Sequence, residues 1–185
     1  MSLVLRTRPL LRLLALSGLL LTGAAHADVY GDVSSLAKSG KTAEAIAKAD
    51  QYLGSNPRDP QMRFLKGVAQ SQAGDLTAAT ATFEALIEEY PELPEPYNNL
   101  AVLYAQQKQY DKARTALEMA IRTHPSYAVA HENLGDVYAK LASQAYDKAL
   151  QLDSSNAHAQ SKLSLIREMI GSSRAPGGKV PAALS

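Results

Sequence analysis

A repeat with a period of 34 residues constrains this 185-residue chain more than any other feature. Residues of three kinds return at that interval, namely a proline, an alanine and a small residue: Pro57, Pro91 and Pro125; Ala45, Ala79 and Ala113; Gly67, Ala101 and Gly135. A fixed period of this length is typical of proteins that stack one supersecondary unit on the next. Each unit then contacts mainly its neighbours, and the stack buries a continuous core.

Each unit has the pattern of two amphipathic helices joined by a turn. In residues 94–127 a helical spacing of apolar residues occurs twice, first in Tyr97, Leu100, Ala101 and Tyr104 and then in Ala113, Leu117, Ala120 and Ile121. The recurring Gly or Ala lets the two helix backbones approach closely, and the recurring proline blocks continuation of the second helix. The chain is therefore predicted to be all-α.

This pattern resembles the tetratricopeptide repeat family, which has an aromatic residue, Leu, a small residue and Tyr on the first helix and Ala, a bulky residue, Ala and Pro on the second. Residues 94–127 match it best, whereas residues 60–93 carry Arg63 and Lys66 where the family has apolar residues. The resemblance implies a right-handed superhelical solenoid of helix-turn-helix repeats with a C-terminal capping helix.

The period divides the chain into segments. We predict a repeat domain over residues 28–170, followed by a disordered tail at 171–185. The domain consists of units at about 28–59, 60–93 and 94–127, a shortened unit at 128–156 and a capping helix at 157–170. The tail is rich in Gly, Pro and Ser without periodicity, which is typical of disorder. Asp59, before Pro60, and Asn156 are predicted helix caps.

The fourth unit lacks a turn between its two helices. No Gly, Pro or Asn occurs from Val137 to Asp153, so one unbroken helix is predicted over about Val129–Asp153. The segment that begins at Tyr146 has the sequence of a second helix in either of two registers. As the end of such a helix it arrives five residues too early, and as a copy of Tyr110–Ala113 it lies 36 residues on instead of 34. One apolar stripe runs along the predicted helix, formed by Leu134, Tyr138, Leu141, Ala145, Ala149 and Leu152.

A straight helix cannot fold back on itself, so the second half of this stripe needs another partner. One possibility is the final helix, through Leu163, Ile166 and Ile170, because a terminal helix normally caps such stacks. The other is a second copy of the chain, in an isologous or domain-swapped homodimer.

The first 27 residues have the composition of a secretory signal peptide. Arg6, Arg8 and Arg12 precede an apolar run, and Ala25-His26-Ala27 provides small residues two positions apart. The apolar run is shorter than the roughly 20 residues that a membrane span needs. We therefore expect cleavage after Ala27, no membrane span in the mature chain, and a periplasmic location.

Composition and motifs give little support to catalysis or nucleic-acid binding. The chain has 19 Lys and Arg against 18 Asp and Glu, and a nucleic-acid-binding protein would show a basic excess. There is no cysteine, and the four histidines have no metal-ligand spacing. Glu88, Glu89 and Glu92 cluster near a helix end without other elements of an active site. We expect no enzyme activity, no cofactor and no metal.

Binding is the remaining function, and the resemblance implies a concave groove lined by the first helix of each unit. The residues at the family's groove positions, which grade from apolar to amide to acidic, are Phe64, Val68, Asn98, Asn99, Val102, Gln106, Glu132, Asp136 and Lys140. Family members that bind acidic chaperone tails use a clamp of two Lys, two Asn and an Arg, and only Asn99 fits that clamp here. We expect a neutral or basic protein or peptide partner.

Two hypotheses follow. The first is a non-catalytic adaptor of the bacterial cell envelope that holds a partner segment in its groove; the bacterial assignment comes from resemblance to exported proteobacterial repeat proteins. The second is a self-associating scaffold that dimerises through the fused helix of the fourth unit.

Overall fold

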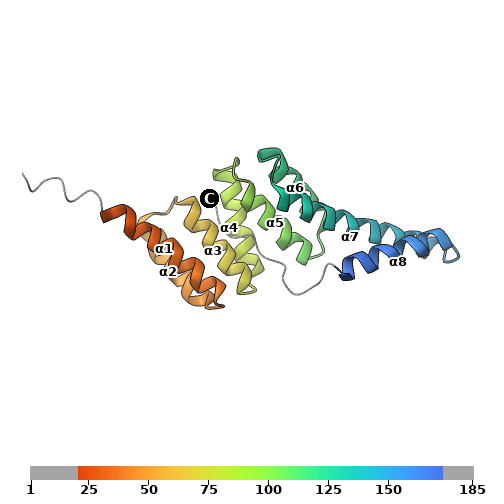
Figure 1. Ribbon diagram of the computed structural model, residues 1–185, viewed down its shortest axis with the longest axis horizontal. Coiled ribbons are helices and arrows are strands. Elements are labelled where there is room, and N and C mark those ends of the chain that lie inside the picture. The colour runs from red at the N-terminus through yellow and green to blue at the C-terminus, as the bar shows by residue number, and fades with distance from the viewer. Residues whose placement is uncertain (1–20, 173–185) are drawn as a thin grey trace, which may run out of the picture.

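The computed structural model describes residues 21–172 and, within them, the side chains of residues 29–171. In this part of the chain all regular structure is helical (Figure 1), and the eight helices are α1 (Leu21–Lys38), α2 (Thr42–Ser55), α3 (Pro60–Gln72), α4 (Leu76–Glu89), α5 (Pro94–Gln106), α6 (Tyr110–Thr123), α7 (Ala128–Leu152) and α8 (Ala157–Ser172). The predicted all-α class is confirmed.

The helices form hairpins that stack in chain order. Within a hairpin, α1 packs on α2, α3 on α4 and α5 on α6, and each hairpin contacts the next through α2–α3, α4–α5 and α6–α7. The first helices of successive units, α1, α3, α5 and α7, also touch one another. Figure 1 shows the result as an elongated row of helix pairs, which is the predicted solenoid.

The core follows the row as three clusters. The first joins α1, α2 and α3 around Val33, Ala45 and Met62. The second joins α3, α4 and α5 around the rings of Phe64 and Phe83, whose centroids lie 5.7 Å apart. The third joins α5, α6 and α7 and consists of Tyr97, Ala101, Ala113, Ala116, Leu117, Ala120, Ala130 and Val137. The recurring alanines are fully or almost fully buried, because they lie where helices cross.

Gly67 shows why one of these positions needs a glycine. A Cβ atom added there would lie 2.8 Å from Cε1 of Phe83 and 3.2 Å from Cγ2 of Thr82. The ring of Phe83 therefore occupies the space that a side chain at position 67 would fill. The predicted close approach of the two helices is confirmed in this unit.

The helix ends have the predicted local causes. Oδ1 of Asp59 accepts a hydrogen bond from the Met62 amide at 2.8 Å, and Oδ1 of Asn156 accepts one from the Ala159 amide at 3.0 Å. Both predicted caps are confirmed. Within each of the first three units the turn contains a residue with positive φ, at +79° in Gly40, +81° in Gly74 and +60° in Lys108. These three residues are also 34 apart.

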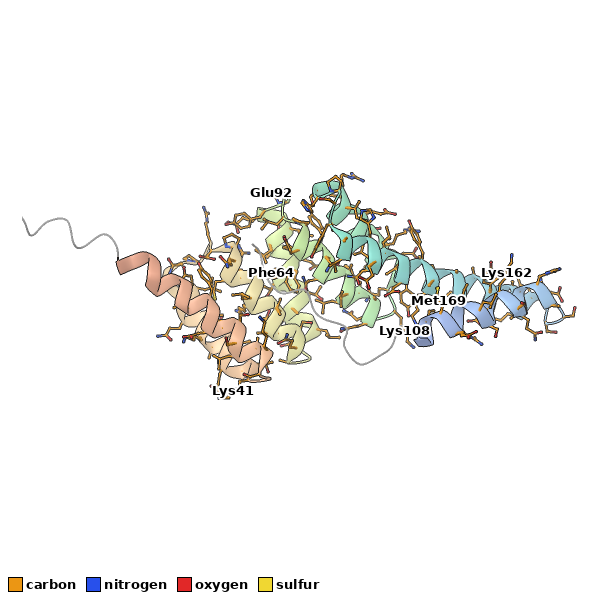
Figure 2. The ribbon with its side chains drawn as sticks, viewed as in Figure 1. Lys41, Phe64, Glu92, Lys108, Lys162 and Met169 are labelled. Carbon is orange, nitrogen blue, oxygen red and sulfur yellow. The ribbon has the colours of Figure 1, made fainter. Side chains whose placement is uncertain are left out.

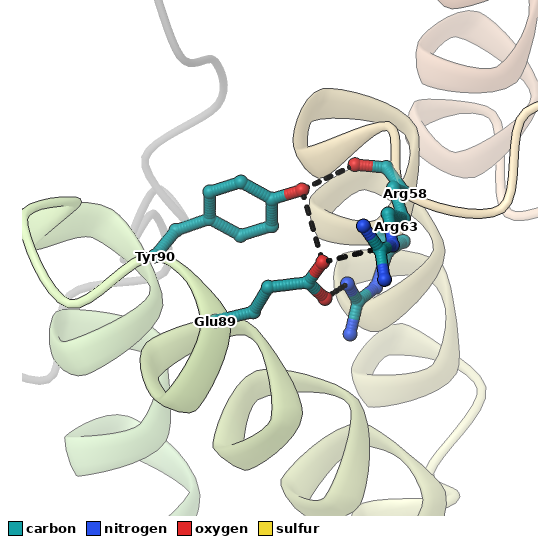
Figure 3. A network of polar contacts seen from close by, with 4 residues as sticks. All are labelled: Arg58, Arg63, Glu89 and Tyr90. Atoms are coloured by element: carbon teal, nitrogen blue, oxygen red, sulfur yellow. Dashed lines mark hydrogen bonds and ion pairs between the residues drawn. The ribbon is translucent and has the colours of Figure 1, made fainter.

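Two basic residues of α3 that stand where the family has apolar ones pair with acidic residues on neighbouring helices. Nη1 of Arg63 lies 2.5 Å from a carboxylate oxygen of Glu89 on α4, and Nζ of Lys66 lies 2.6 Å from Asp50 on α2. Figure 3 shows that Arg58 and the hydroxyl of Tyr90 join the same network around Glu89. Arg63 and Lys66 therefore connect α3 to the helices on either side of it.

The N-terminal helix extends into the predicted signal peptide. α1 begins at Leu21, so the predicted cleavage site after Ala27 lies inside it, and cleavage stays a prediction. Val29, Tyr30 and Val33 of α1 pack in the first core cluster with residues of α2 and α3. The hydroxyl of Tyr30 donates a 2.5 Å hydrogen bond to Asp59, which anchors α1 at the start of α3. Residues 1–20 lie outside the described residues.

The fourth unit is a single helix, as predicted. α7 runs without a break from Ala128 to Leu152, within one residue of the predicted bounds at both ends. α8 folds back and packs against α7, as Figure 1 shows, and buries Ala159 and Leu163. It ends at Ser172, so the first two residues of the predicted disordered tail are helical, and the rest of that tail lies outside the described residues.

α8 does not cover the whole predicted stripe of α7. Leu134 and Leu141 pack against the cluster of α5 and α6, whereas Tyr138 is 49% exposed and Leu152 is 78% exposed. Nη2 of Arg167 on α8 lies 2.8 Å from Asp147, which lies on another side of α7 from this stripe. The prediction that the final helix buries the second half of the stripe is therefore wrong for Ala145 and Leu152, which are both exposed.

Candidate binding groove

A groove lies between the first helices of the third and fourth units. It encloses about 300 Å³ and is bounded by α5, α6 and α7. The buried side chains Ala101, Leu117 and Val137 form an apolar floor. The other lining residues are Val102, Ala105, Gln106, Tyr110, Asn133, Asp136 and Lys140.

Four of the predicted groove residues line this site together. Val102 and Gln106 lie one turn apart on α5, and Asp136 and Lys140 lie one turn apart on α7. Glu132 is exposed on α7, one turn before Asp136, and does not line the groove. The apolar, amide and charged groups therefore meet within one site between two units.

Phe64 and Val68 are not groove residues. Phe64 is 1% exposed and Val68 is 8% exposed, and both pack in the core cluster of α3, α4 and α5. Figure 2 shows Phe64 in the middle of the stack. The prediction was wrong because α4 and α5 both close over this face of α3, so its apolar side chains complete the core and do not face a partner.

Asn98 and Asn99 are also buried, and both already bind within the chain. Asn98 is fully buried, and its Oδ1 accepts a hydrogen bond from Nδ2 of Asn133 at 2.8 Å. Nδ2 of Asn99 donates to the carbonyl oxygen of Glu95, one turn earlier on α5, at 2.9 Å. Because both amides are buried in this arrangement, their predicted role in holding the backbone of a partner is corrected to a structural one.

Asn133 lines the groove, although it is not among the predicted groove residues. Its hydrogen bond to Asn98 ties α7 to α5 directly beside the groove. Because Asn98 is fully buried and Asn133 is half-buried, few other partners compete for this bond, and it holds the spacing of the two helices. Asn99 and Asn133 are 34 residues apart, but only Asn133 bonds to a neighbouring helix, whereas the amide of Asn99 donates within α5.

The charge around the groove is mixed. A second cavity of about 470 Å³ adjoins the groove, with which it shares Tyr110 and Lys140. Lys108 and Arg167 line it as well, and Figure 2 shows Lys108 near the C-terminal part of α8. Arg167 is paired with Asp147. The acidic character expected from Glu132 and Asp136 is therefore balanced by basic side chains on the same helix and on its neighbours.

A third cavity, of about 410 Å³, lies between α4, α5 and α6. Within it, Nζ of Lys112 lies 5.3 Å from the ring centre of Tyr104, whose hydroxyl donates a 2.8 Å hydrogen bond to Glu84. Burial, together with the hydrogen bond and charge of Glu84, raises the pKa of Tyr104 to about 12. This tyrosine stays neutral in neutral solution and serves as a hydrogen-bond donor.

Glu89, one of the three clustered acidic residues near the end of α4, has a structural role. Glu89 pairs with Arg63 and Arg58, and the hydrogen bond from Arg63 is the main cause that holds the pKa of Glu89 below its usual value. Among the described residues, no three His, Asp or Glu side chains are grouped as a metal ion would require. Among residues 21–172 we also find no helix with the length and apolar character needed to cross a membrane.

The helix hairpins, their stacking and the groove between first helices define a helical repeat protein. Two family models of the tetratricopeptide repeat match the chain, one over residues 30–94 and the other over residues 71–141. The two matches overlap and together extend over more than half of the chain. Residues 30–141 therefore belong to the tetratricopeptide repeat family.

Individual relatives agree with this assignment. The chain is 32% identical over 84 residues to the tetratricopeptide repeat domain-containing protein PYG7, chloroplastic, of Arabidopsis thaliana. The aligned segment covers 43% of this chain and 28% of that protein. It thus spans little more than a quarter of that relative's length.

Solved structures show the same fold. The thermophilic protein TTC0263 of Thermus thermophilus superposes with a TM-score of 0.59 at 23% identity, over 78% of this chain and 82% of that one. The first such domain of human RPAP3 superposes with a TM-score of 0.59 at 16% identity, over 63% and 92%. At these identities the likeness shows the fold alone.

Proposed function

We propose that the protein is a non-catalytic adaptor that holds a segment of a partner protein in the groove between α5 and α7. Proteins of this fold generally serve as scaffolds for protein–protein interaction. The observation that carries the proposal is the open groove itself, whose floor is apolar and whose edges carry amide, acidic and basic groups. Such a site buries apolar side chains and orients a chain through a few polar contacts.

The groove suits a segment that is neutral overall. Asp136 and Lys140 lie one turn apart on the same wall, so a partner with an excess of either charge gains from one and is repelled by the other. Of the neutral and basic partners expected from the sequence, the neutral one agrees better with this arrangement. One or two apolar side chains would fill the space above Ala101, Leu117 and Val137.

The location is also a proposal. The arginines, the apolar run and the small residues before Asp28 support export through a cleaved signal peptide, and hence action in the bacterial envelope. Expression in a Gram-negative host, followed by N-terminal sequencing of the periplasmic fraction, tests it. A chain that begins at Asp28 is expected, and an uncleaved chain that stays in the cytoplasm would contradict the proposal.

Capture of a partner tests the groove. We would crosslink the chain in an envelope extract and compare it with Val102→Glu, which places a charge over the apolar floor, and with Gln160→Glu on the exposed surface of α8. A partner that is retained by the wild type and by Gln160→Glu but lost with Val102→Glu is expected. Circular dichroism must show that both variants are folded. Equal capture by all three proteins would place the binding surface elsewhere.

A further inference from the structure

One side of α7 has no helix packed against it in the described chain. α5 and α6 cover the side that carries Ala130 and Val137, and α8 lies along the side that carries Asp147. The residues on the remaining side follow one another at alternating intervals of four and three positions, and all except the first are small or apolar. They are His131, Gly135, Tyr138, Ala142, Ala145, Ala149 and Leu152. A strict seven-residue repeat of this kind is the pattern by which two long helices pack together.

The second unit shows what normally covers this side. There, α4 packs on α3 so closely that the ring of Phe83 fills the space above Gly67. Gly135 has the same position in the fourth unit, two periods later, but a Cβ atom added to it would meet nothing within 4 Å. The first half of α7 is therefore the first helix of a unit whose second helix is missing from its place.

The residues of that second helix are present in the second half of α7. Ala142, Tyr146 and Ala149 have the spacing of Ala113, Leu117 and Ala120, the fully buried residues of α6. In α7, however, all three are only half-buried, and at the edge of this side Nζ of Lys162 on α8 lies 5.8 Å from the ring centre of Tyr146. Because α7 is continuous, these residues cannot fold back over Gly135 of the same molecule. The same three residues of a second copy of the chain are free of this restriction and can lie over Gly135 of the first copy.

We propose that the chain forms a homodimer in which two α7 helices pack antiparallel, the first half of each against the second half of the other. Both halves are then covered at once by the residue types that the intact units use. If Tyr146 of one copy lies over Gly135 of the other, as Phe83 lies over Gly67, the two-fold axis passes between Lys140 and Leu141. The interface is isologous and therefore closed.

The dimer goes beyond the proposed adaptor function and is compatible with it. Asp136 and Lys140 face the groove, whereas Gly135, Tyr138 and Ala142 lie on the other side of α7. Each copy would keep an open groove, so the dimer would present two. The two surfaces can be tested separately, because loss of partner capture and loss of the dimer follow from different substitutions.

The solution mass tests the dimer. We expect twice the mass of one chain for the wild type by light scattering. Gly135→Leu fills open space in the single chain but collides with the second α7, and Ala145→Glu places a charge in the interface. Each is expected to weaken dimerisation at least about tenfold, which corresponds to 1.4 kcal/mol. Gln151→Glu, exposed on another side of α7, is the control and should leave the mass unchanged.

Two results would overturn the proposal. One is a wild-type chain that stays monomeric at concentrations of about 100 μM, where a stable protein interface would be formed. The other is a dimer that both Gly135→Leu and Ala145→Glu leave intact while circular dichroism shows them folded, because that dimer would use another surface.

The orientation of the two helices can be tested independently, since the chain has no cysteine. Ala142→Cys places two thiols close to the proposed axis, whereas Gln151→Cys places them about 30 Å apart along the helices, at a rise of 1.5 Å per residue. A short bismaleimide is expected to crosslink the first variant into dimers and not the second. Efficient crosslinking through position 151 alone would contradict the antiparallel arrangement.

Discussion

The replacement Gly67→Ala tests whether the close packing of helix pairs holds this fold together. The added Cβ atom would lie 2.8 Å from Cε1 and 2.9 Å from Cζ of Phe83. Phe83 is fully buried and packs against Phe64, so its ring cannot move away without disturbing the core cluster. Overpacking of a buried site costs roughly 1–3 kcal/mol. Against this, alanine favours a helix interior over glycine by roughly 1 kcal/mol.

The balance should destabilise Gly67→Ala by about 1 kcal/mol. The matched control is Gly31→Ala in α1, where an added Cβ meets nothing within 4 Å. Only the gain in helix propensity operates there, so the control should be stabilised by roughly 1 kcal/mol. Urea unfolding followed by circular dichroism measures both free energies of unfolding. If Gly67→Ala were stabilised as much as Gly31→Ala, the ring of Phe83 would not restrict this position and the reasoning would be refuted.

Three further predictions concern turns and charges. Lys108→Gly should raise the free energy of unfolding by about 0.5 kcal/mol in urea, because glycine adopts the left-handed φ of this turn without strain; no gain would mean that Lys108 is unstrained. Glu89, whose pKa is lowered mainly by the hydrogen bond from Arg63, stabilises the fold above pH 4.5, and this contribution disappears as acid protonates it. Acid titration of stability should therefore be flatter in Glu89→Gln, and an unchanged titration would contradict the pairing. Tyr104, whose pKa is raised from 10.0 to about 12, stabilises the fold fully below pH 10 and loses this contribution as the pH rises through 12. Tyr104→Phe should lose less stability than the wild type over that alkaline range, as urea midpoints would show.

The sequence alone determined the features that depend on local interactions. The 34-residue period identified the helix pairs, Asp59 and Asn156 were identified as caps, and the absence of a turn after Val137 predicted the continuous helix α7. The caps and the continuous helix depend on residues within a few positions of one another, and the helix pairs follow from a pattern that returns in each unit. None of these features requires knowledge of which helices pack together.

Only the tertiary structure decided which side chains remain available to a partner. Phe64, Val68 and Asn98 occupy groove positions of the family but are covered by neighbouring helices, whereas Val102 and Gln106 remain at the groove. Burial depends on what packs over a helix from elsewhere in the chain, and a repeat pattern describes each helix in the same way whatever covers it.

The position of α8 was decided in the same way. The sequence offered one apolar stripe on α7 for it to cover, but the pair between Arg167 and Asp147 lies on another side of that helix. Tyr138 and Leu152 consequently stay exposed. An apolar pattern predicts that a face of a helix will be buried, but it does not show which helix will cover it. That depends on the packing and the charges of every helix within reach. In α7 one face stays uncovered in the described chain.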